Sequence, residues 1–160
     1  MDVPQLIERA RAIAGCTLLP PRGIPAIAES HTLPNDLAIF YRLCGGMALF
    51  VESEYPITLV SPDAFVLANP LIVGELCEYD ISSSWYILSR DRNNEALTID
   101  LHPGRLGRCY DSFYERHGVR GSCPIIARSF TEFLSRILDR NGGYYYWLQS
   151  DFISLGDAYD

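Results

Sequence analysis

Three hydrophobic runs separated by two short turn segments place the strongest constraint on how this chain can fold. The runs span residues 85–89, 96–101 and 108–113. Residues 91–94 read Asp-Arg-Asn-Asn and residues 102–107 read His-Pro-Gly-Arg-Leu-Gly, and both segments are rich in residue types that favour tight turns. Because connections this short join antiparallel neighbours, the pattern predicts three adjacent strands of one antiparallel sheet.

The middle run also indicates how this sheet is buried. Leu97, Ile99 and Leu101 alternate with Thr98 and Asp100. Successive side chains of a strand point to opposite faces. The alternation therefore predicts one face packed on a core and one face exposed to solvent.

Helices are predicted on both sides of these strands in the sequence. Residues 3–14 carry apolar side chains at helical spacing, and Asp2 is placed to cap them. Residues 33–44 form a second apolar stripe, and Gly45-Gly46 is expected to end it in a left-handed conformation. Residues 129–132 have the S-x-x-E form of a capping box, which predicts a third helix. The side chains that the last two helices should bury together are Phe40, Tyr41, Phe130, Phe133, Leu134 and Ile137.

The remaining patterns complete the expected architecture. Further strands are expected at residues 47–51 and 57–60, a short helix at 61–68, and either a closing strand or a patch on the helix at 144–148. The predicted class is α+β: a single antiparallel sheet with helices packed against it, and with N-terminal and C-terminal helices flanking the strands. A length of 160 residues is usual for one domain, so residues 1–160 are expected to form a single domain.

The charge distribution bears on the class of partner. The net charge is -7, and every one of the thirteen basic residues is an arginine. A phosphate backbone repels such a surface, so direct binding of nucleic acid is not expected. Residues 43–89 contain six acidic residues and no basic one. This stretch is either a solvated face that maintains solubility or a docking surface for a basic protein.

The five cysteines indicate a reducing compartment. They are odd in number and form no close pair, which favours free thiols and a cytoplasmic location. The first residues are too polar for a signal peptide, and no stretch approaches the ~20 apolar residues of a membrane span. Neither a disulfide nor contact with a membrane is therefore expected.

Motifs for catalysis or cofactor binding are missing. The chain has no CxxC, no HExxH, no GxGxxG and no P-loop, so neither a metal nor another cofactor is expected. One catalytic alternative remains, a small hydrolase or transferase that uses Asp100, His102 and Cys109, which lie near the ends of neighbouring predicted strands. Nothing marks a nucleophile turn or an oxyanion donor pair, so no catalytic residue is assigned and the chain is expected not to be an enzyme.

Three segments resemble the SUKH superfamily. Residues 33–46 are similar to its "LP-x-D/E-L…F-Y…N/G-G" helix, with Gly45 where an asparagine is common. Residues 96–101, followed by Gly107 and Tyr110, are similar to its hairpin that ends in an aspartate. Residues 126–134 resemble its "A-x-S-F-x-E-F-L" final helix. Order and spacing agree from residue 1 to about residue 140, apart from residues 70–84, which match nothing.

The resemblance implies an α+β domain with helices packed on an antiparallel sheet, and it brings no catalytic residues. It also implies a role, because many bacterial members are immunity proteins that bind and neutralise a cognate toxin, often a basic nuclease. Fungal relatives act as regulatory adaptors, and a stand-alone adaptor is the alternative interpretation. A cytoplasmic protein that binds a basic toxin domain is the expected function.

Two groups of residues are expected to contact such a partner. Acidic side chains of the base-free stretch would attract a basic surface, and the aromatic run near the C-terminus would supply anchors, since tyrosine and tryptophan are enriched at interfaces. These residues are Glu52, Glu54, Glu75, Glu78, Asp80, Tyr144, Tyr145, Tyr146 and Trp147.

Overall fold

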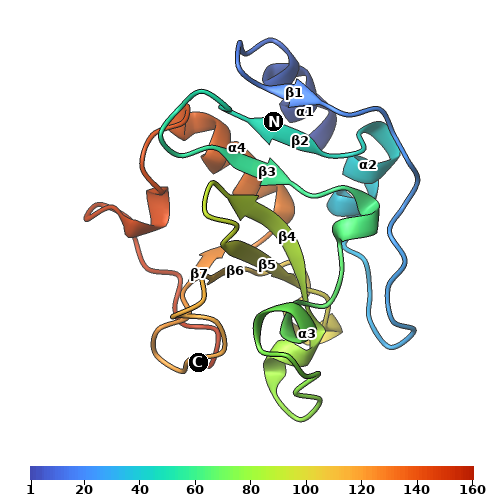
Figure 1. The fold of residues 1–160 in the computed structure, drawn as a ribbon, viewed down its shortest axis with the longest axis vertical. Coiled ribbons are helices and arrows are strands. Elements are labelled where there is room, and N and C mark those ends of the chain that lie inside the picture. Colours follow the sequence, from blue (N-terminus) through green and yellow to red (C-terminus); the bar gives the residue numbers. More distant parts are fainter.

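A seven-stranded antiparallel sheet, with its strands in chain order from β1 to β7, organises the protein (Figure 1). The computed structural model describes all residues, 1–160. The strands are β1 (Thr17–Leu18), β2 (Met47–Leu49), β3 (Ile57–Leu59), β4 (Trp85–Asp91), β5 (Ala96–Asp100), β6 (Cys109–Ser112) and β7 (Ile125–Ala127). The α-helices are α1 (Val3–Arg11), α2 (Asn35–Leu43), α3 (Ala68–Ile72) and α4 (Phe130–Arg140). Four 3₁₀ turns complete the elements: η1 (Pro62–Ala64), η2 (Ile81–Ser84), η3 (Pro103–Arg105) and η4 (Tyr146–Leu148).

The predicted antiparallel hairpins are confirmed. Strand β5 lies between β4 and β6, with Trp85 opposite Asp100 and Thr98 opposite Tyr110. The outer strands β1 and β7 were not predicted, because two or three residues are too few to show an alternating pattern. The α+β class with one antiparallel sheet is therefore established.

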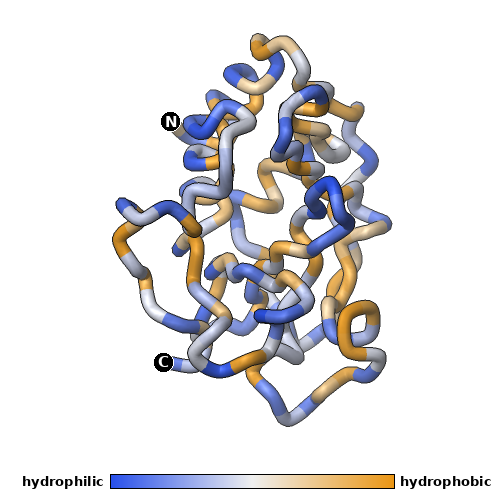
Figure 2. Tube along the Cα trace, turned by 60° about the vertical axis from the view of Figure 1, so that its left-hand side comes forward, coloured by the Kyte–Doolittle hydropathy of each residue, from blue (hydrophilic) through white to orange (hydrophobic).

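Three of the four helices form one layer that packs against one face of the sheet. Helices α1, α2 and α4 contact one another, and their apolar sides join the strands in a single core. The predicted burial of Phe40, Tyr41, Phe130, Phe133, Leu134 and Ile137 is confirmed. The rings of Phe40 and Phe130 are 5.0 Å apart at the contact between α2 and α4. Figure 2 shows hydrophobic and hydrophilic stretches alternating along the trace, with hydrophobic stretches through the middle of the molecule and also in some outer loops.

Asp36 links the starts of two of these helices. Helix α2 has Pro34 at its N-cap and no side-chain cap of its own. Asp36 accepts hydrogen bonds from the backbone N–H (2.9 Å) and the hydroxyl (2.8 Å) of Thr131, which lies 95 residues away in the first turn of α4. The carboxylate thereby satisfies a free donor of α4 and sits at its positive end. The aspartate of the "LP-x-D/E-L" pattern is thus a structural residue here.

The second face of the sheet is also covered, which corrects the prediction that Thr98 and Asp100 face solvent: both are fully buried. A smaller apolar cluster of Trp85, Tyr110, Cys123, Ile125 and Ala158 lies on this face. The C-terminal segment closes over it, because the Ile125 N–H donates to the Gly156 carbonyl (2.9 Å) and the Ala158 N–H donates to the Cys123 carbonyl (2.8 Å). The alternation of apolar and polar residues along a strand indicates the polarity of each face. It does not indicate whether a later segment of the chain covers the polar face.

Three local predictions are also corrected. The expected helix at residues 61–68 is only the 3₁₀ turn η1, and the α-helix begins later, at Ala68. Helix α2 ends at Leu43 with an extended Cys44 as its C-cap, so the expected left-handed stop at Gly45-Gly46 does not directly follow the helix. The positive φ belongs to Gly46, where the backbone approaches the Leu59 carbonyl so closely that a Cβ would be 2.9 Å from its oxygen. Residues 144–148 form no closing strand but lead into the turn η4.

Candidate protein-binding site

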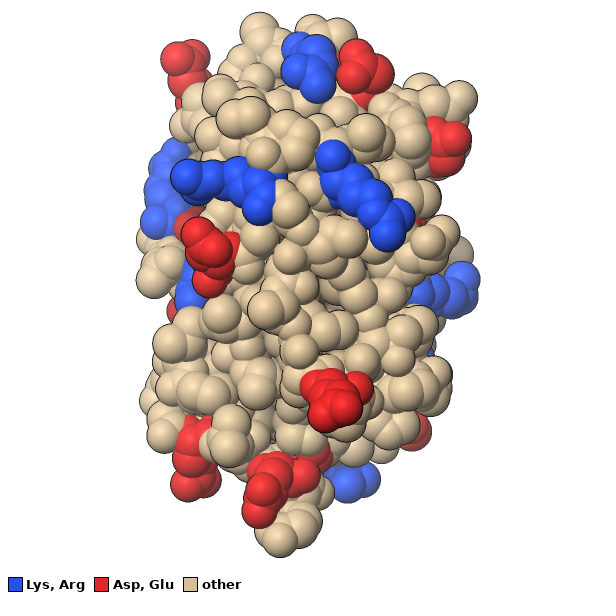
Figure 3. Space-filling model, turned by 90° about the vertical axis from the view of Figure 1, so that its right-hand side faces the viewer, with Lys and Arg blue, Asp and Glu red and all other residues tan.

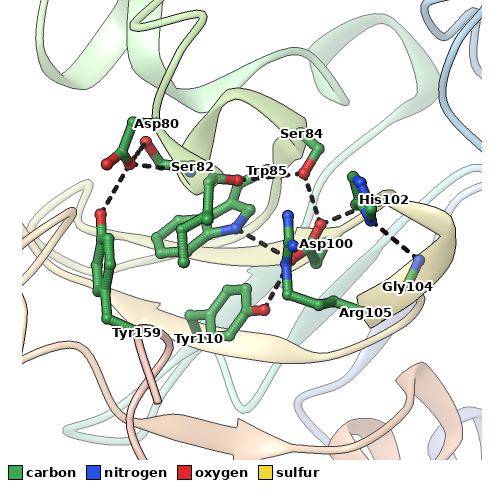
Figure 4. A network of polar contacts seen from close by, with 11 residues as sticks. Asp80, Ser82, Ser84, Trp85, Asp100, His102, Gly104, Arg105, Tyr110 and Tyr159 are labelled. Atoms are coloured by element: carbon green, nitrogen blue, oxygen red, sulfur yellow. Dashed lines mark hydrogen bonds and ion pairs between the residues drawn. The ribbon is translucent and has the colours of Figure 1, made fainter.

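Asp100 is the centre of a buried polar network on the second face of the sheet (Figure 4). Its carboxylate accepts hydrogen bonds from the Ser84 hydroxyl (2.7 Å), the Trp85 indole (3.1 Å) and the Tyr110 hydroxyl (2.7 Å). The Arg105 guanidinium pairs with it at 2.9 Å, and the His102 N–H donates to it at 3.0 Å. A buried carboxylate needs such partners to offset the loss of water. Both carboxylate oxygens of Asp100 are therefore used by hydrogen bonds and an ion pair within the chain.

The structure does not assemble the three residues of the catalytic alternative. Cys109 is the direct register partner of Ile99, so its side chain points to the helix-covered face, whereas Asp100 points to the other. Burial raises the pKa of the Cys109 thiol well above its ordinary value. His102 is exposed, and its Nδ1 accepts a hydrogen bond from the Gly104 N–H at 2.9 Å. The hydrolase or transferase arrangement is thus not formed in this structure.

No group of three or more His, Cys, Asp or Glu side chains is placed to hold a metal ion. The five cysteines are unpaired, and Cys44, Cys109 and Cys123 are buried. No helix has the length and apolar character needed to cross a membrane.

The structure separates the predicted contact residues into two groups. Glu54, Tyr144 and Tyr145 line one groove, although about ninety residues separate them in the sequence, and Glu52 is exposed in the same turn between β2 and β3. Glu75 and Glu78 are exposed in the loop that follows α3, at the lower end of the molecule in Figure 1. Asp80 closes that loop and is half-buried.

The groove lined by Glu54, Tyr144 and Tyr145 is called here the aromatic groove. Its volume is about 440 Å³. The turns β2–β3 and β4–β5, the segment after β6 and the segment after α4 all contribute to its walls. Its lining residues are Glu54, Tyr55, Asp91, Arg92, Asn93, Glu95, Phe113, Tyr114, Glu115, Arg116, Tyr144, Tyr145 and Leu148.

The charges of the aromatic groove favour a cationic ligand. Four carboxylates line it against two guanidinium groups. Arg116 already pairs with the buried Asp111 at 3.0 Å, and Arg92 donates to the Ser53 carbonyl. Glu54 and Glu115 form neither a hydrogen bond nor an ion pair within the chain, whereas Asp91 and Glu95 receive bonds from neighbouring groups. Two carboxylates therefore remain free to pair with a basic side chain.

Buried contacts hold the aromatic wall of the groove in place. The ring of Tyr145 stacks on Trp147 at 4.9 Å, and the Trp147 indole donates to Asp111 at 2.9 Å. The Tyr145 hydroxyl donates to Asp91 at 2.8 Å, and burial together with this carboxylate raises the pKa of Tyr145. Tyr55 meets Tyr144 and Tyr145 edge-on at 5.2 and 5.3 Å. A rigid aromatic surface loses little entropy when it binds a partner.

Tyr146 and Trp147 do not belong to this surface, because both are buried in the main core. The Tyr146 hydroxyl donates to the Ile126 carbonyl at 2.6 Å. Burial increases along the four consecutive aromatic residues: Tyr144 is exposed, Tyr145 is half-buried, and Tyr146 and Trp147 are buried. The prediction that Tyr146 and Trp147 contact a partner is therefore not carried further.

Asp80 likewise has a structural role. It caps η2 by accepting from the Ser82 N–H at 3.0 Å, and the Tyr159 hydroxyl donates to it at 2.8 Å (Figure 4). Burial by itself raises the pKa of Asp80, but these hydrogen bonds outweigh burial and place the pKa below its ordinary value. The carboxylate fastens the C-terminal segment to the loop after α3. Of the acidic residues in this group, only Glu75 and Glu78 are free at the surface.

Of the thirteen residues that line the aromatic groove, sequence reasoning proposed only Glu54, Tyr144 and Tyr145, and it missed among others Tyr55, Asp91, Glu95, Tyr114 and Glu115. Asp91 lies in the segment 91–94 that the sequence marked only as a turn, Glu95 directly follows that segment, and Tyr114 and Glu115 follow the end of β6. No spacing rule joins these segments, since sheet pairing alone brings their ends together.

Comparison of the sequence with known proteins identifies one matching family and one similar protein. The sequence profile of the SMI1 / KNR4 family (SUKH-1) matches residues 28–136, which run from the segment before α2 into α4. The chain is 50% identical over 160 residues to "Immunity protein YokJ" of Bacillus subtilis (strain 168), an alignment that covers 100% of this chain and 97% of that protein. No solved structure matches the chain.

Proposed function

The chain belongs to the SMI1 / KNR4 family (SUKH-1), and on this basis we propose that it is an immunity protein that binds and neutralises a toxin protein. The observation that carries the proposal is the 50% identity with an immunity protein along the full length of the chain. The alignment covers the whole of this chain and 97% of that protein, so the likeness is not confined to one segment.

Binding rather than catalysis is the mechanism that the local chemistry supports. Asp100 is fully occupied by structural hydrogen bonds, and Cys109 is a buried thiol on the opposite face of the sheet. The aromatic groove instead offers rigid rings and unpaired carboxylates, which are features of protein interfaces. Neutralisation then results from covering the toxin rather than modifying it.

The partner in this proposal is a basic toxin domain of the nuclease type, bound in the cytoplasm. The net charge of -7 suits such a partner, because opposite charges accelerate encounter and reject wrong partners. Residues 1–160 act as a single SUKH-like domain, without direct contact to nucleic acid or membrane. Glu52, Glu54, Tyr144 and Tyr145 on one side and Glu75 and Glu78 on the other are the proposed contact residues.

Co-expression with a neighbouring toxin gene tests the function. A host that produces the toxin domain alone should stop growing, and production of this chain should restore growth. The purified proteins should form a stable complex in size-exclusion chromatography. If neither protection nor a complex is seen with any toxin-type protein encoded beside this gene, the immunity function is wrong.

A further inference from the structure

We propose that the aromatic groove continues into two further hollows, and that the three together form one docking surface for a partner that carries both basic and apolar side chains. This inference rests on the proposed function and names the surface and the partner chemistry. The surface is called here the furrow. It runs from Tyr144 and Glu54 at one end, past Glu95 and Tyr114, to Leu71 and Val66 at the other.

Shared residues establish the continuity of the furrow. The aromatic groove and a middle hollow of about 320 Å³ share Glu95 and Tyr114. The middle hollow and a third one of about 420 Å³ share Leu71. Leu71 is 61% exposed and stands between the last two hollows, contributing to the wall of each. The furrow thus reaches from the predicted contact residues Glu54, Tyr144 and Tyr145 to Leu71, which precedes Glu75 and Glu78 in the sequence by only a few residues.

The far end of the furrow is almost entirely apolar. Eight of the nine residues that line the third hollow are hydrophobic by the usual classification. Its floor is the stacked pair Phe65 and Tyr86, 5.2 Å apart, and the Tyr86 hydroxyl is held by the Ala28 N–H at 3.0 Å and by His31 at 2.8 Å. A preformed floor of this kind suits an inserted apolar side chain.

Exposed apolar side chains are also concentrated beside this end. Val66, Leu71, Val73, Leu76 and Tyr79 lie within fourteen residues, and Tyr79 is 96% exposed. Figure 3 views the side of the molecule where residues 20–30 lie and shows a broad area without charged side chains across its middle, with charged groups of both signs above it and mainly acidic ones below. Apolar surface of this density on a soluble chain marks an interaction site.

Charge complementarity identifies the occupant. Glu54 and Glu115 at one end of the furrow, and Glu75 and Glu78 in the exposed loop after α3, have no basic partner in the chain. The three arginines along the furrow are held by the chain itself: Arg116 by Asp111, and Arg90 and Arg92 by backbone carbonyls. Arg116 also lies over the Phe113 ring at 5.5 Å, the geometry that an incoming guanidinium would adopt on the tyrosine rings. The partner surface thus presents arginine or lysine side chains around an apolar anchor.

The two ends should act on different rate constants. Exposed carboxylates attract a basic partner over a distance and act mainly on association, an effect that salt screens over about 8 Å at physiological ionic strength. An inserted apolar contact at Leu71 acts after encounter and slows dissociation. This difference makes each end separately measurable.

Binding kinetics with the toxin domain encoded beside the gene test the furrow at two salt concentrations. Glu54→Gln combined with Glu115→Gln should lower the association rate about fivefold at low salt and much less at high salt. Leu71→Ser should raise the dissociation rate about 10- to 30-fold, as expected of a hot spot. The controls are Asp151→Asn and Ile153→Ser, which alter an exposed acid and an 83% exposed apolar side chain in a hollow that shares no residue with the furrow.

The outcomes separate the furrow from the function. A wild-type chain that does not bind the toxin domain overturns the immunity function itself. A wild-type chain that binds, with furrow variants that behave like the two controls, leaves the function standing and overturns the furrow. If only the glutamate variant or only Leu71→Ser changes its rate constant, the two ends do not belong to one continuous docking surface, and the proposal is wrong. Sedimentation that shows a wild-type dimer and a monomeric Leu71→Ser variant assigns the apolar end to self-association, and this also overturns the proposal.

Discussion

Asp100 ties four parts of the chain together through one buried carboxylate. Its partners come from η2, β4, β6 and the turn after β5, and the side chain of its ion-pair partner Arg105 is only partly exposed. Removing one member of such a pair leaves donors without an acceptor, and this costs more than the pair itself contributes. Asp100 is therefore expected to be the most sensitive polar position of the fold.

Replacement of this carboxylate is the corresponding test. Asp100→Asn should lower the free energy of unfolding by about 3–5 kcal/mol, because the new amide group faces hydroxyl, indole and guanidinium donors. Urea unfolding monitored by tryptophan fluorescence measures the loss. The exposed control Asp151→Asn should change stability by less than about 0.5 kcal/mol. A loss below about 1 kcal/mol for Asp100→Asn would show that the network is dispensable.

His117 is a second sensitive position, because it is buried beside α3. Its Nε2 lies 2.6 Å from the Asn69 side-chain oxygen, and its Nδ1 has no hydrogen-bond partner. Asn69 in turn donates to Ser82 at 3.0 Å and to the Leu76 carbonyl at 3.1 Å. Burial lowers the pKa of His117 from 6.5 to about 4, although the nearby Asp80 opposes this shift.

Acid should therefore destabilise the protein through His117. Between pH 6.5 and pH 4 the unfolded chain binds a proton that the folded state excludes, so stability is complete above pH 6.5 and falls as the pH decreases. The expected contribution is at most about 3 kcal/mol. It is measured as the difference in free energy of unfolding between pH 7 and pH 4.5 for wild type and for His117→Gln, which cannot titrate. Equal differences for the two proteins would contradict the assignment.

Helix α4 is the element whose formation the sequence specifies most completely. Ser129 caps it by accepting from the Glu132 N–H at 3.1 Å, as the S-x-x-E pattern predicts, and Asn141 ends it with a positive φ. Its apolar side is buried against α1, α2 and β7. Capping and periodicity agree with the burial that the structure shows, so local and tertiary preferences support each other.

Truncation within this helix measures how tightly the core is packed. Phe133 is fully buried, and Phe133→Ala should lower the free energy of unfolding by about 3–5 kcal/mol. Ser135→Ala, on the same helix but outside the buried stripe, serves as control and should change stability by less than about 0.5 kcal/mol. Chemical denaturation of both variants provides the comparison. A small loss for Phe133→Ala would mean that the core collapses around the missing ring.

The two sides of the sheet are covered by parts of the chain with very different character. Regular helices cover one side, whereas η2, the segment after β6 and the C-terminal residues cover the other without regular structure. Tyr159 secures this second cover through its hydrogen bond to Asp80 and its contact with Trp85. The protein is thus expected to be less stable on its C-terminal side.

Deletion of residues 154–160 tests the importance of this cover. The loss of Ala158 and Tyr159 exposes Trp85 and should lower the free energy of unfolding by about 2–4 kcal/mol. Tryptophan emission should shift to longer wavelength, since Trp85 is one of only two tryptophans in the chain. Tyr159→Phe keeps the ring and is the matched control, with a loss of about 1 kcal/mol. Unchanged emission after the deletion would show that the segment is not a cover.

Local patterns in the sequence determined the strands β4, β5 and β6, the helices α1, α2 and α4, and the antiparallel order of the sheet. They succeeded because turn chemistry, capping and apolar periodicity act over a few residues, and short connections leave neighbouring strands only one way to pair. Glu54, Tyr144 and Tyr145 could be proposed as contacts for a similar reason, since charge and aromatic type are visible without a fold.

Only the tertiary structure decided which distant segments meet. Asp36 bonds to Thr131 across 95 residues, and Glu54 shares a groove with Tyr144. The same packing removed Trp147 from the surface and buried Asp100 behind a C-terminal segment. The physical reason is that burial depends on what lies against a side chain, and the covering segment is distant in sequence from the residue it covers. A polarity pattern describes one helix or strand at a time. It cannot specify which distant segment packs on that element, and this packing decides whether a residue lies in the core or at an interface.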